Sequence, residues 1–194
     1  IQLKSWAKEK IILGDLGEWR QAAKTAKRPQ ELRDGVLWID SSDFKMQKKD
    51  GGGRKSPKWS YKCNGFGRRF MFITNAKGVV IKLWGGYSPK VYDSAFIEIQ
   101  QDFFETHFRG AAFLADQHFE VAQDEFDDIK FLTPFKKPKA KRSASGEDIS
   151  TLTKKQEKYN HQQRALRSRV ETFCLDQVQV HVSEQGLGRI PSTT

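Results

Sequence analysis

Short apolar runs separated by polar and glycine-bearing segments predict a chain in which strands and helices alternate. Six runs have a strand-like texture: VLWID (36–40), WSYKCN (59–64), RFMFITN (69–75), VVIKLWGG (79–86), AAFLAD (111–116) and IKFLTPF (129–135). The third and fourth runs flank Ala76-Lys77-Gly78, a short turn that contains glycine. We therefore expect these two runs to form an antiparallel hairpin.

Helical spacing of apolar residues marks three further regions. The first thirty or so residues predict an N-terminal helical arm, residues 1–34, that packs on one edge of the core. A contact with DNA or with a partner is the alternative role of this arm. A second helix is expected after Pro89, capped by Asp93 or Ser94. Its expected apolar side consists of Phe96, Ile99, Phe103 and Phe104.

The third helical region, NHQQRALRSRVETF (160–173), has two distinct faces. Asn160, Arg164, Arg167 and Glu171 stand at offsets of 4, 3 and 4, so they share one face. The adjacent apolar stripe consists of Tyr159, Leu166, Val170 and Phe173. A helical glutamate near two arginines can be an ordinary surface ion pair. Beside a catalytic carboxylate, however, an arginine would hold a phosphate group with its fork of donors.

Three acidic residues on separate elements predict a metal-binding nuclease centre. Asp40 closes VLWID, Asp116 closes AAFLAD, and Glu171 lies in the late helix. An apolar run that stops at an aspartate places a carboxylate at the C-terminal edge of a buried strand, where the sheet holds it rigidly. Two such edges and a helical glutamate could hold two Mg²⁺ or Mn²⁺ ions, a geometry that suits phosphodiester cleavage.

Polar residues near these acids have simpler explanations. Asp43 follows Asp40 by three residues and is either an alternate ligand or a polar turn residue. We expect Asp93 to cap a helix. We expect His118 to be an exposed neighbour of Asp116, with assistance near the metal ions as its alternative role.

The balance of charge indicates a polyanionic partner. There are 34 Lys and Arg against 24 Asp and Glu, which gives a net charge of +10 and a pI of about 9.6. A DNA backbone is the expected partner, although a solvated lysine-rich face gives the same balance. The loop KMQKKDGGGRKSPK (45–58) is either a grip on DNA or an ordinary solvated loop, and KKPKAKR (136–142) is a nuclear-import signal, a backbone contact or a solvated linker. The residues expected at double-stranded DNA are Arg54, Lys55, Lys136, Lys137, Lys139, Arg164 and Arg167.

Other features of the composition limit the class of protein. Cys63 and Cys174 are too far apart for a zinc site and too few for a disulfide framework, so a reducing intracellular location is expected. The interpretation of KKPKAKR (136–142) as an import signal makes that location nuclear. No apolar run approaches the ~20 residues needed to cross a bilayer, and no signal-peptide pattern opens the chain. Because the chain begins with Ile1 rather than Met, we expect a trimmed chain or one part of something longer. The expected division is a helical arm (1–34), one catalytic domain (35–180) and a C-terminal tail (181–194).

Five segments, in the same order, resemble the DDE transposases of the Harbinger type over roughly residues 38 to 173. The segments are WIDSSDF (38–44), KWSYKCNGFGRRFMFITNAKGVVIKLWGGYSPKVYDS (58–94), LADQHF (114–119), FLTPFKKP (131–138) and LTKKQEKYNHQQRALRSRVETF (152–173). The chain departs from the pattern of that family at Ser41, Tyr92, Ala115 and His118, and it keeps all three acids.

The resemblance implies both a fold and an activity. The fold is a ribonuclease H-like mixed five-stranded sheet flanked by helices, in which the first strand, the end of the fourth and a late helix converge. The activity is that of an Mg²⁺-dependent endonuclease or transposase catalytic domain acting on double-stranded DNA, with Asp40, Asp116 and Glu171 as catalytic residues and ligands of two ions. Such enzymes use a separate DNA-binding region or partner and bring two or more active sites together. The alternatives are a domesticated relative that has lost cleavage and a basic interaction module without catalysis.

Overall fold

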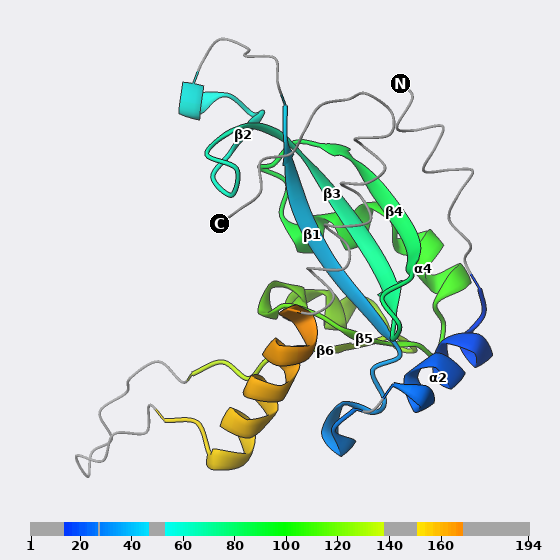
Figure 1. Ribbon diagram of the computed structural model, residues 1–194. Coiled ribbons are helices and arrows are strands. Elements are labelled where there is room, and N and C mark those ends of the chain that lie inside the picture. The colour runs from blue at the N-terminus through cyan, green and yellow to red at the C-terminus, as the bar shows by residue number, and fades with distance from the viewer. Residues whose placement is uncertain (1–13, 27, 47–52, 138–150, 169–194) are drawn as a thin grey trace.

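The centre of the fold is a curled mixed sheet of six strands, shown in Figure 1. The computed structural model describes residues 14–26, 28–46, 53–137 and 151–168. The strands are β1 (Leu37–Lys45), β2 (Trp59–Ser60), β3 (Gly65–Asn75), β4 (Val80–Tyr87), β5 (Ala112–Leu114) and β6 (Lys130–Leu132).

Long antiparallel strands form one half of the sheet, and short parallel strands form the other. β3 lies between β1 and β4 and is antiparallel to both, while β2 pairs with the first two residues of β3. β5 is parallel to β1, and β6 is parallel to β5. With β2 set aside, the strand order is β4-β3-β1-β5-β6. A strand that joins a sheet in parallel needs a crossover connection, and the helical segment between β4 and β5 supplies it.

Helices surround this sheet. They are α2 (Leu16–Thr25), α3 (Asp93–Ile99), α4 (Gln101–His107), the 3₁₀ helices η1 (Gln30–Leu32), η2 (Gly53–Lys55) and η3 (Gln117–Glu125), and a last helix over 154–168. α2 begins at a capping box in which the Asp15 and Glu18 side chains each accept a hydrogen bond from the other's backbone N–H. Within the described residues, no helix has the length and apolar character that a bilayer span requires.

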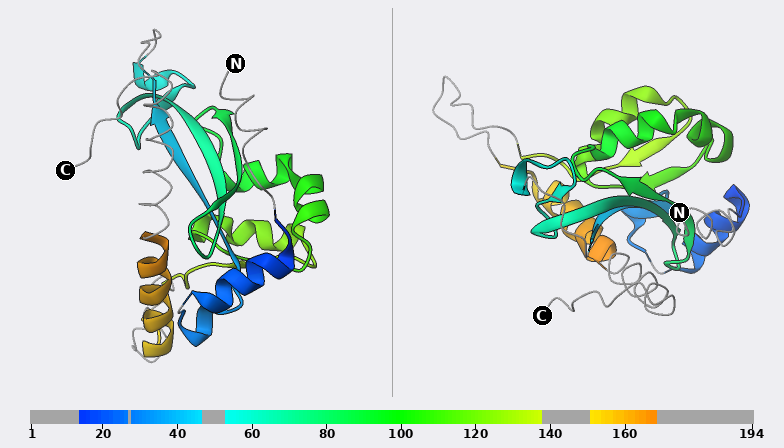
Figure 2. Two further views of the ribbon diagram at one scale, coloured as in Figure 1. Left: turned by 45° about the vertical axis from the view of Figure 1, so that its right-hand side comes forward. Right: turned by 90° about the horizontal axis from the view of Figure 1, so that it is seen from above.

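Each face of the sheet has its own cover, because successive side chains of a strand point to opposite faces. Leu37 and Ile39 of β1 join the larger apolar cluster, together with aromatic residues of α3, α4 and η3. Trp38 points the other way and joins a smaller cluster with Leu114, against which the 154–168 helix packs. Figure 2 shows that helix and the α3–α4 pair on opposite sides of the sheet. The side chain of Asp40 therefore belongs to the face that the last helix covers.

The mixed α/β architecture and the β3–β4 hairpin were predicted correctly, but the strand boundaries were not. β1 does not end at Asp40; it continues to Lys45, because its antiparallel pairing with β3 runs on to Gly67. WSYKCN contributes only the two residues of β2, and the sheet has six strands where the resemblance implied five.

The segment after Pro89 also differs from its prediction. It forms two short helices, separated at Gln100, whose φ of −112° and ψ of 18° are not helical. Neither Asp93 nor Ser94 is the cap: the N-cap is Tyr92, without a side-chain hydrogen bond, and the Asp93 carboxylate is engaged elsewhere. Ile99 is 58% exposed and does not belong to the apolar side.

The expected domain boundaries fall partly outside the described residues. α2 lies within the expected arm and buries Trp19, Ala22 and Ala23. Residues 1–13, the end of the expected catalytic domain at 169–180 and the expected tail at 181–194 are not described.

The close packing of Gly85 against its cross-strand partner Phe70 gives a test of this register. A Cβ added at Gly85 would lie 1.7 Å from Phe70 Cδ1. We expect Gly85→Ala to lower the free energy of unfolding by about 2 kcal/mol, because the ring would have to leave its place on the sheet. Denaturant titration measures this change.

Gly65→Ala is the matched control in the neighbouring strand. A Cβ there would meet nothing nearer than Lys45 Cε at 3.4 Å, so a change below about 1 kcal/mol is expected. Equal losses in the two variants would contradict the register between β3 and β4.

Candidate functional site

Strand register places Asp40 and Asp116 side by side. Trp38 of β1 and Leu114 of β5 are partners in the parallel pair. Asp40 follows Trp38 by two residues, and Asp116 follows Leu114 by two residues. Side chains two residues apart in an extended chain lie on the same face. Both carboxylates therefore emerge on the face that carries Trp38 and Leu114. The sequence predicted this convergence, although it wrongly placed Asp40 at the end of its strand.

One guanidinium group joins the two carboxylates. Arg167 Nη1 lies 2.8 Å from Asp116 Oδ2, and Arg167 Nε lies 3.4 Å from Asp40 Oδ2. The side chains are 28% and 11% exposed for Asp116 and Asp40 and 32% exposed for Arg167. Charges that are partly withdrawn from water interact more strongly than fully exposed ones. The arrangement is a pair of carboxylates aimed at one cation.

Backbone donors fix the second oxygen of each carboxylate. The N–H of Ser41 donates to Asp40 Oδ1 over 2.7 Å, and the N–H of Gln117 donates to Asp116 Oδ1. The Oδ2 atoms are thereby left pointing at Arg167. Together with Gln163, the two charged partners Asp40 and Arg167 border a small recess whose walls include Trp38 and Leu114.

Two amide side chains attach the last helix to the ends of the parallel strands. Gln163 is 2% exposed, and its Nε2 donates to the carbonyl oxygens of Ala115 and Leu132 over 2.9 and 2.7 Å. Asn160 exchanges two hydrogen bonds with the backbone of Phe135, of 2.8 and 2.9 Å. These bonds set the height and rotation of the helix and so bring Arg167 to the aspartates.

The face of this helix that reaches the site differs from the expected one. It consists of Asn160, Gln163 and Arg167, whereas Arg164 is exposed and does not contact the aspartates through any ion pair in the described structure. Gln163 was missed, because an uncharged amide gives no signal of chemistry. Its offsets of three from Asn160 and four to Arg167 were visible in the sequence.

Glu171, the third expected ligand, lies outside the described residues. In the part of the chain that the structure describes, no group of three or more His, Cys, Asp or Glu side chains is placed to hold a metal ion. The structure thus brings together two of the three predicted acids and places Arg167, one of the two arginines expected beside them, between them.

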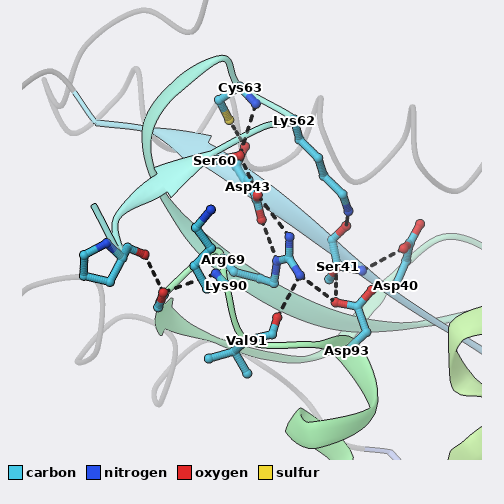
Figure 3. Close-up of polar contacts among 12 residues, drawn as sticks. Asp40, Ser41, Asp43, Ser60, Lys62, Cys63, Arg69, Lys90, Val91 and Asp93 are labelled. Atoms are coloured by element: carbon cyan, nitrogen blue, oxygen red, sulfur yellow. Dashed lines mark hydrogen bonds and ion pairs between the residues drawn. The ribbon is translucent and has the colours of Figure 1, made fainter. Parts of the chain in front are cut away.

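The opposite face of β1 carries a separate polar network, drawn in Figure 3. Arg69 is the cross-strand partner of Asp43 and donates from Nε and Nη2 to its two carboxylate oxygens, over 2.7 and 3.1 Å. Ser60 Oγ donates to Asp43 Oδ2 over 2.6 Å. Asp43 is therefore neither an alternate ligand nor a turn residue, because its position three residues after Asp40 puts it on the other side of the strand.

Asp93 extends this network to the candidate site. Its Oδ1 accepts hydrogen bonds from Ser41 Oγ over 2.7 Å and from Arg69 Nη1 over 3.3 Å. Ser41 is also the residue whose N–H holds Asp40. Figure 3 shows the resulting chain of contacts from Asp43 through Arg69, Asp93 and Ser41 to Asp40.

Among the described residues, the other basic residues expected at DNA form no ion pair with Asp40 or Asp116. Lys136 forms an ion pair with Glu120, Lys137 is exposed, and Lys139 lies outside the described residues. Arg54 and Lys55 are exposed in η2, at the other end of the sheet. His118 is exposed beside Asp116, as expected.

Comparisons with known protein families, with curated proteins and with solved structures found no match to this chain. The function of the site is therefore inferred from its own residues, from their geometry and from the resemblance of the sequence motifs.

The Asp43–Arg69 pair predicts how stability depends on pH. Burial alone would raise the pKa of Asp43, but hydrogen bonds from Arg69 and Ser60 and the charge of Arg69 outweigh it and lower the pKa. A carboxyl whose pKa is lowered by folding stabilises the protein above its unfolded pKa of about 3.9. That stabilisation is lost as the pH falls through the lowered pKa of the folded state.

We expect Asp43→Asn to lower the free energy of unfolding by about 3 kcal/mol at pH 7, because it removes the carboxylate that Arg69 contacts through two nitrogens. The longer contact of Arg69 with Asp93, over 3.3 Å, would remain. The loss should shrink below pH 4, and denaturant titrations from pH 3 to pH 7 measure it. Asp128→Asn is the control, since the Arg109–Asp128 pair is 75% and 64% exposed and exposed pairs contribute at most about 1 kcal/mol. A pH-independent effect of Asp43→Asn would contradict the prediction.

Proposed function

We propose that this chain is the catalytic domain of a metal-dependent DNA endonuclease or transposase with a ribonuclease H-like fold, and that Asp40, Asp116 and Glu171 are its catalytic acids. The observation that carries the proposal is the convergence of Asp40 and Asp116 on a single cationic group. These residues lie 76 positions apart in the sequence, and a nuclease centre gives a reason for their meeting.

The donor set fits a divalent cation of the Mg²⁺ type. Both carboxylates present an Oδ2 atom to the Arg167 guanidinium, which shows that this position accepts positive charge. Carboxylate oxygens are the ligands that Mg²⁺ and Mn²⁺ prefer. Two bound ions would supply activation of the attacking oxygen and stabilisation of the leaving oxygen. Glu171 follows Arg167 by four residues, the spacing of neighbours on one helix face.

The strand order also supports the proposal. Without β2 the order is β4-β3-β1-β5-β6, with β1, β5 and β6 mutually parallel. β1, the end of β5 (the fourth strand when β2 is left out) and the last helix meet at Asp40, Asp116 and Arg167. The resemblance to DDE transposases implies the same convergence.

Residues of the chain would position the substrate. The net charge of +10 attracts a DNA backbone. Arg167 would transfer its two donors from the carboxylates to a phosphate, because a guanidinium fork matches phosphate oxygens as well as carboxylate oxygens. Ser41 and Gln117 would continue to orient Asp40 and Asp116 through their backbone N–H groups.

A second function is favoured by the same arginine. Arg167 already neutralises both aspartates, and a chain that needs no metal could keep this arrangement permanently. The second proposed function is therefore that of a transposase-derived DNA-binding or interaction protein that has lost cleavage.

Plasmid nicking tests the catalytic proposal. We expect the chain to nick supercoiled DNA with Mg²⁺ or Mn²⁺ and Asp116→Asn to reduce the rate at least about 100-fold, because a ligand oxygen is lost. Asparagine keeps the acceptor that bonds to the Gln117 N–H, so the local fold should survive. Glu171→Gln should have the same effect, and Asp128→Asn, at an exposed pair, should have none.

DNA binding measured in the same samples separates the alternatives. Asp116→Asn should bind DNA like the parent chain. Nicking by Asp116→Asn at the parental rate would refute the site, whereas tight binding without nicking by any chain would favour the inactive relative.

Metal binding without DNA tests the role of Arg167. If the guanidinium competes with ions for Asp40 and Asp116, Arg167→Met should raise the affinity for Mn²⁺ about tenfold, which corresponds to about 1.4 kcal/mol of lost competition. Calorimetric titration measures this affinity. Arg164→Met is the matched control, because Arg164 is an exposed arginine one turn away on the same helix.

A lower Mn²⁺ affinity in Arg167→Met would mean that Arg167 only supports the site. Undetectable Mn²⁺ binding in every chain would favour the inactive relative.

A further inference from the structure

Nearly all of the net positive charge of this protein comes from one stretch of sequence. Residues 51–92 contain nine Lys and Arg and no Asp or Glu, whereas the remainder of the chain is almost balanced, with 25 basic and 24 acidic residues. The stretch includes η2, β2, β3 and β4 and ends just before α3.

Part of this stretch forms a surface that is both basic and aromatic. Tyr61 is 71% exposed and Tyr92 is 78% exposed. Arg54, Lys55, Lys62 and Lys90 are also exposed. We call these six residues the basic-aromatic rim: Arg54, Lys55, Tyr61, Lys62, Lys90 and Tyr92.

Contacts between loops hold the rim together. The Lys90 ammonium lies 4.3 Å from the centre of the Tyr61 ring, which joins the loop before α3 to the turn after β2. Ser88 Oγ donates to the carbonyl oxygen of Pro57, between the same loop and the segment after η2. Segments that are about thirty residues apart in sequence are thus in direct contact at the rim.

The polar network of Asp43, Arg69 and Asp93 holds the backbone of these loops in place. Arg69 Nη1 donates to the carbonyl oxygen of Val91 over 2.8 Å, directly before Tyr92. Ser60, which bonds to Asp43, also accepts from the N–H of Cys63 over 3.1 Å and so closes the turn that carries Tyr61. The two tyrosine rings are exposed although their backbones are fixed, which lowers the entropy cost of binding a ligand on them.

The chemistry of the rim selects one type of ligand. Four cationic side chains suit phosphate groups, and exposed tyrosine rings beside them suit the flat faces of nucleobases. In a duplex these faces are covered by base stacking, whereas unpaired nucleotides present them. We propose that the basic-aromatic rim binds a single-stranded segment of DNA by stacking bases on Tyr61 and Tyr92.

The rim is connected to the candidate site. Lys62 Nζ donates to the carbonyl oxygen of Ser41 over 3.2 Å, next to Asp40 (Figure 3). A DNA strand bound on the rim would therefore lead along β1 to the aspartates. This inference rests on the proposed function for the choice of DNA as ligand, and it adds that the nucleotides beside the cut are unpaired.

Binding of labelled oligonucleotides in EDTA tests the rim without any contribution from metal. A single strand of about 15 nucleotides, near the upper size of single-strand sites, is compared with a blunt duplex of equal length. Tyr61→Ser/Tyr92→Ser should weaken single-strand binding at least about tenfold, and Tyr61→Phe/Tyr92→Phe should stay within about twofold of the parent chain, because phenylalanine keeps the stacking face. Duplex affinity should change little in both.

Two further variants separate stacking from charge and from general apolar exposure. Arg54→Ala/Lys55→Ala should reduce the slope of log affinity against log salt by about 1.4 for the single strand, the value for two lost phosphate contacts. Val121→Ser removes an apolar side chain that is 61% exposed on η3, outside the rim, and should leave binding unchanged.

Single-strand affinity that is unaffected by the serine pair, or duplex affinity that falls equally, would overturn the inference. Failure of the nuclease proposal is distinguishable: tyrosine-dependent single-strand binding in a chain that neither nicks DNA nor binds Mn²⁺ would keep the rim and reject catalysis. Metal-dependent nicking that is indifferent to the tyrosines would do the reverse.

Discussion

The parallel pairing of β1 with β5 is the constraint on which the candidate site depends. Only Leu37 and Trp38 of β1 take part in it, yet this short contact fixes the alignment of two strands that are far apart in sequence. A shift of one residue would turn Asp116 to the opposite face and separate it from Asp40. The amide of Gln163 secures the same alignment, since it donates to the carbonyl groups of Ala115, directly after β5, and of Leu132, the last residue of β6. Arg167 can reach both aspartates because the β1–β5 pairing aligns the two carboxylates and the Gln163 hydrogen bonds hold the last helix above them.

Arg167 balances part of the negative charge of the site. Two carboxylates that share a partly dehydrated position repel each other, and a cation between them removes that repulsion. The fold therefore does not need an ion to keep Asp40 and Asp116 together. The same contact is compatible with both proposals, the nuclease at rest and the inactive transposase-derived protein.

The sequence was a good guide where side-chain chemistry and local pattern coincide. Asp40 and Asp116 were recognisable because each ends an apolar run, and the hairpin was recognisable from its glycine turn. The roles of Asp43 and Asp93 were not, because Arg69 is the partner that explains them and only strand register reveals it. The break at Gln100 was hidden because the residues on both sides continue a helical pattern. Gln163 was missed because a structural amide resembles any polar surface residue. The absence of acidic residues from 51–92 was visible in the sequence, but only the basic loop at 45–58 was interpreted as a DNA contact.

Ser41 connects the two faces of the sheet. Its N–H holds Asp40 on one side of the sheet, while its hydroxyl holds Asp93, the first residue of α3, on the other. Asp93 in turn is fixed by the arginine that supports the loop of Tyr92. A path of hydrogen bonds thus runs from the loop of Tyr92 through Arg69, Asp93 and Ser41 to the carboxylate of Asp40, so an occupant bound on that loop would act on Asp40 through these contacts.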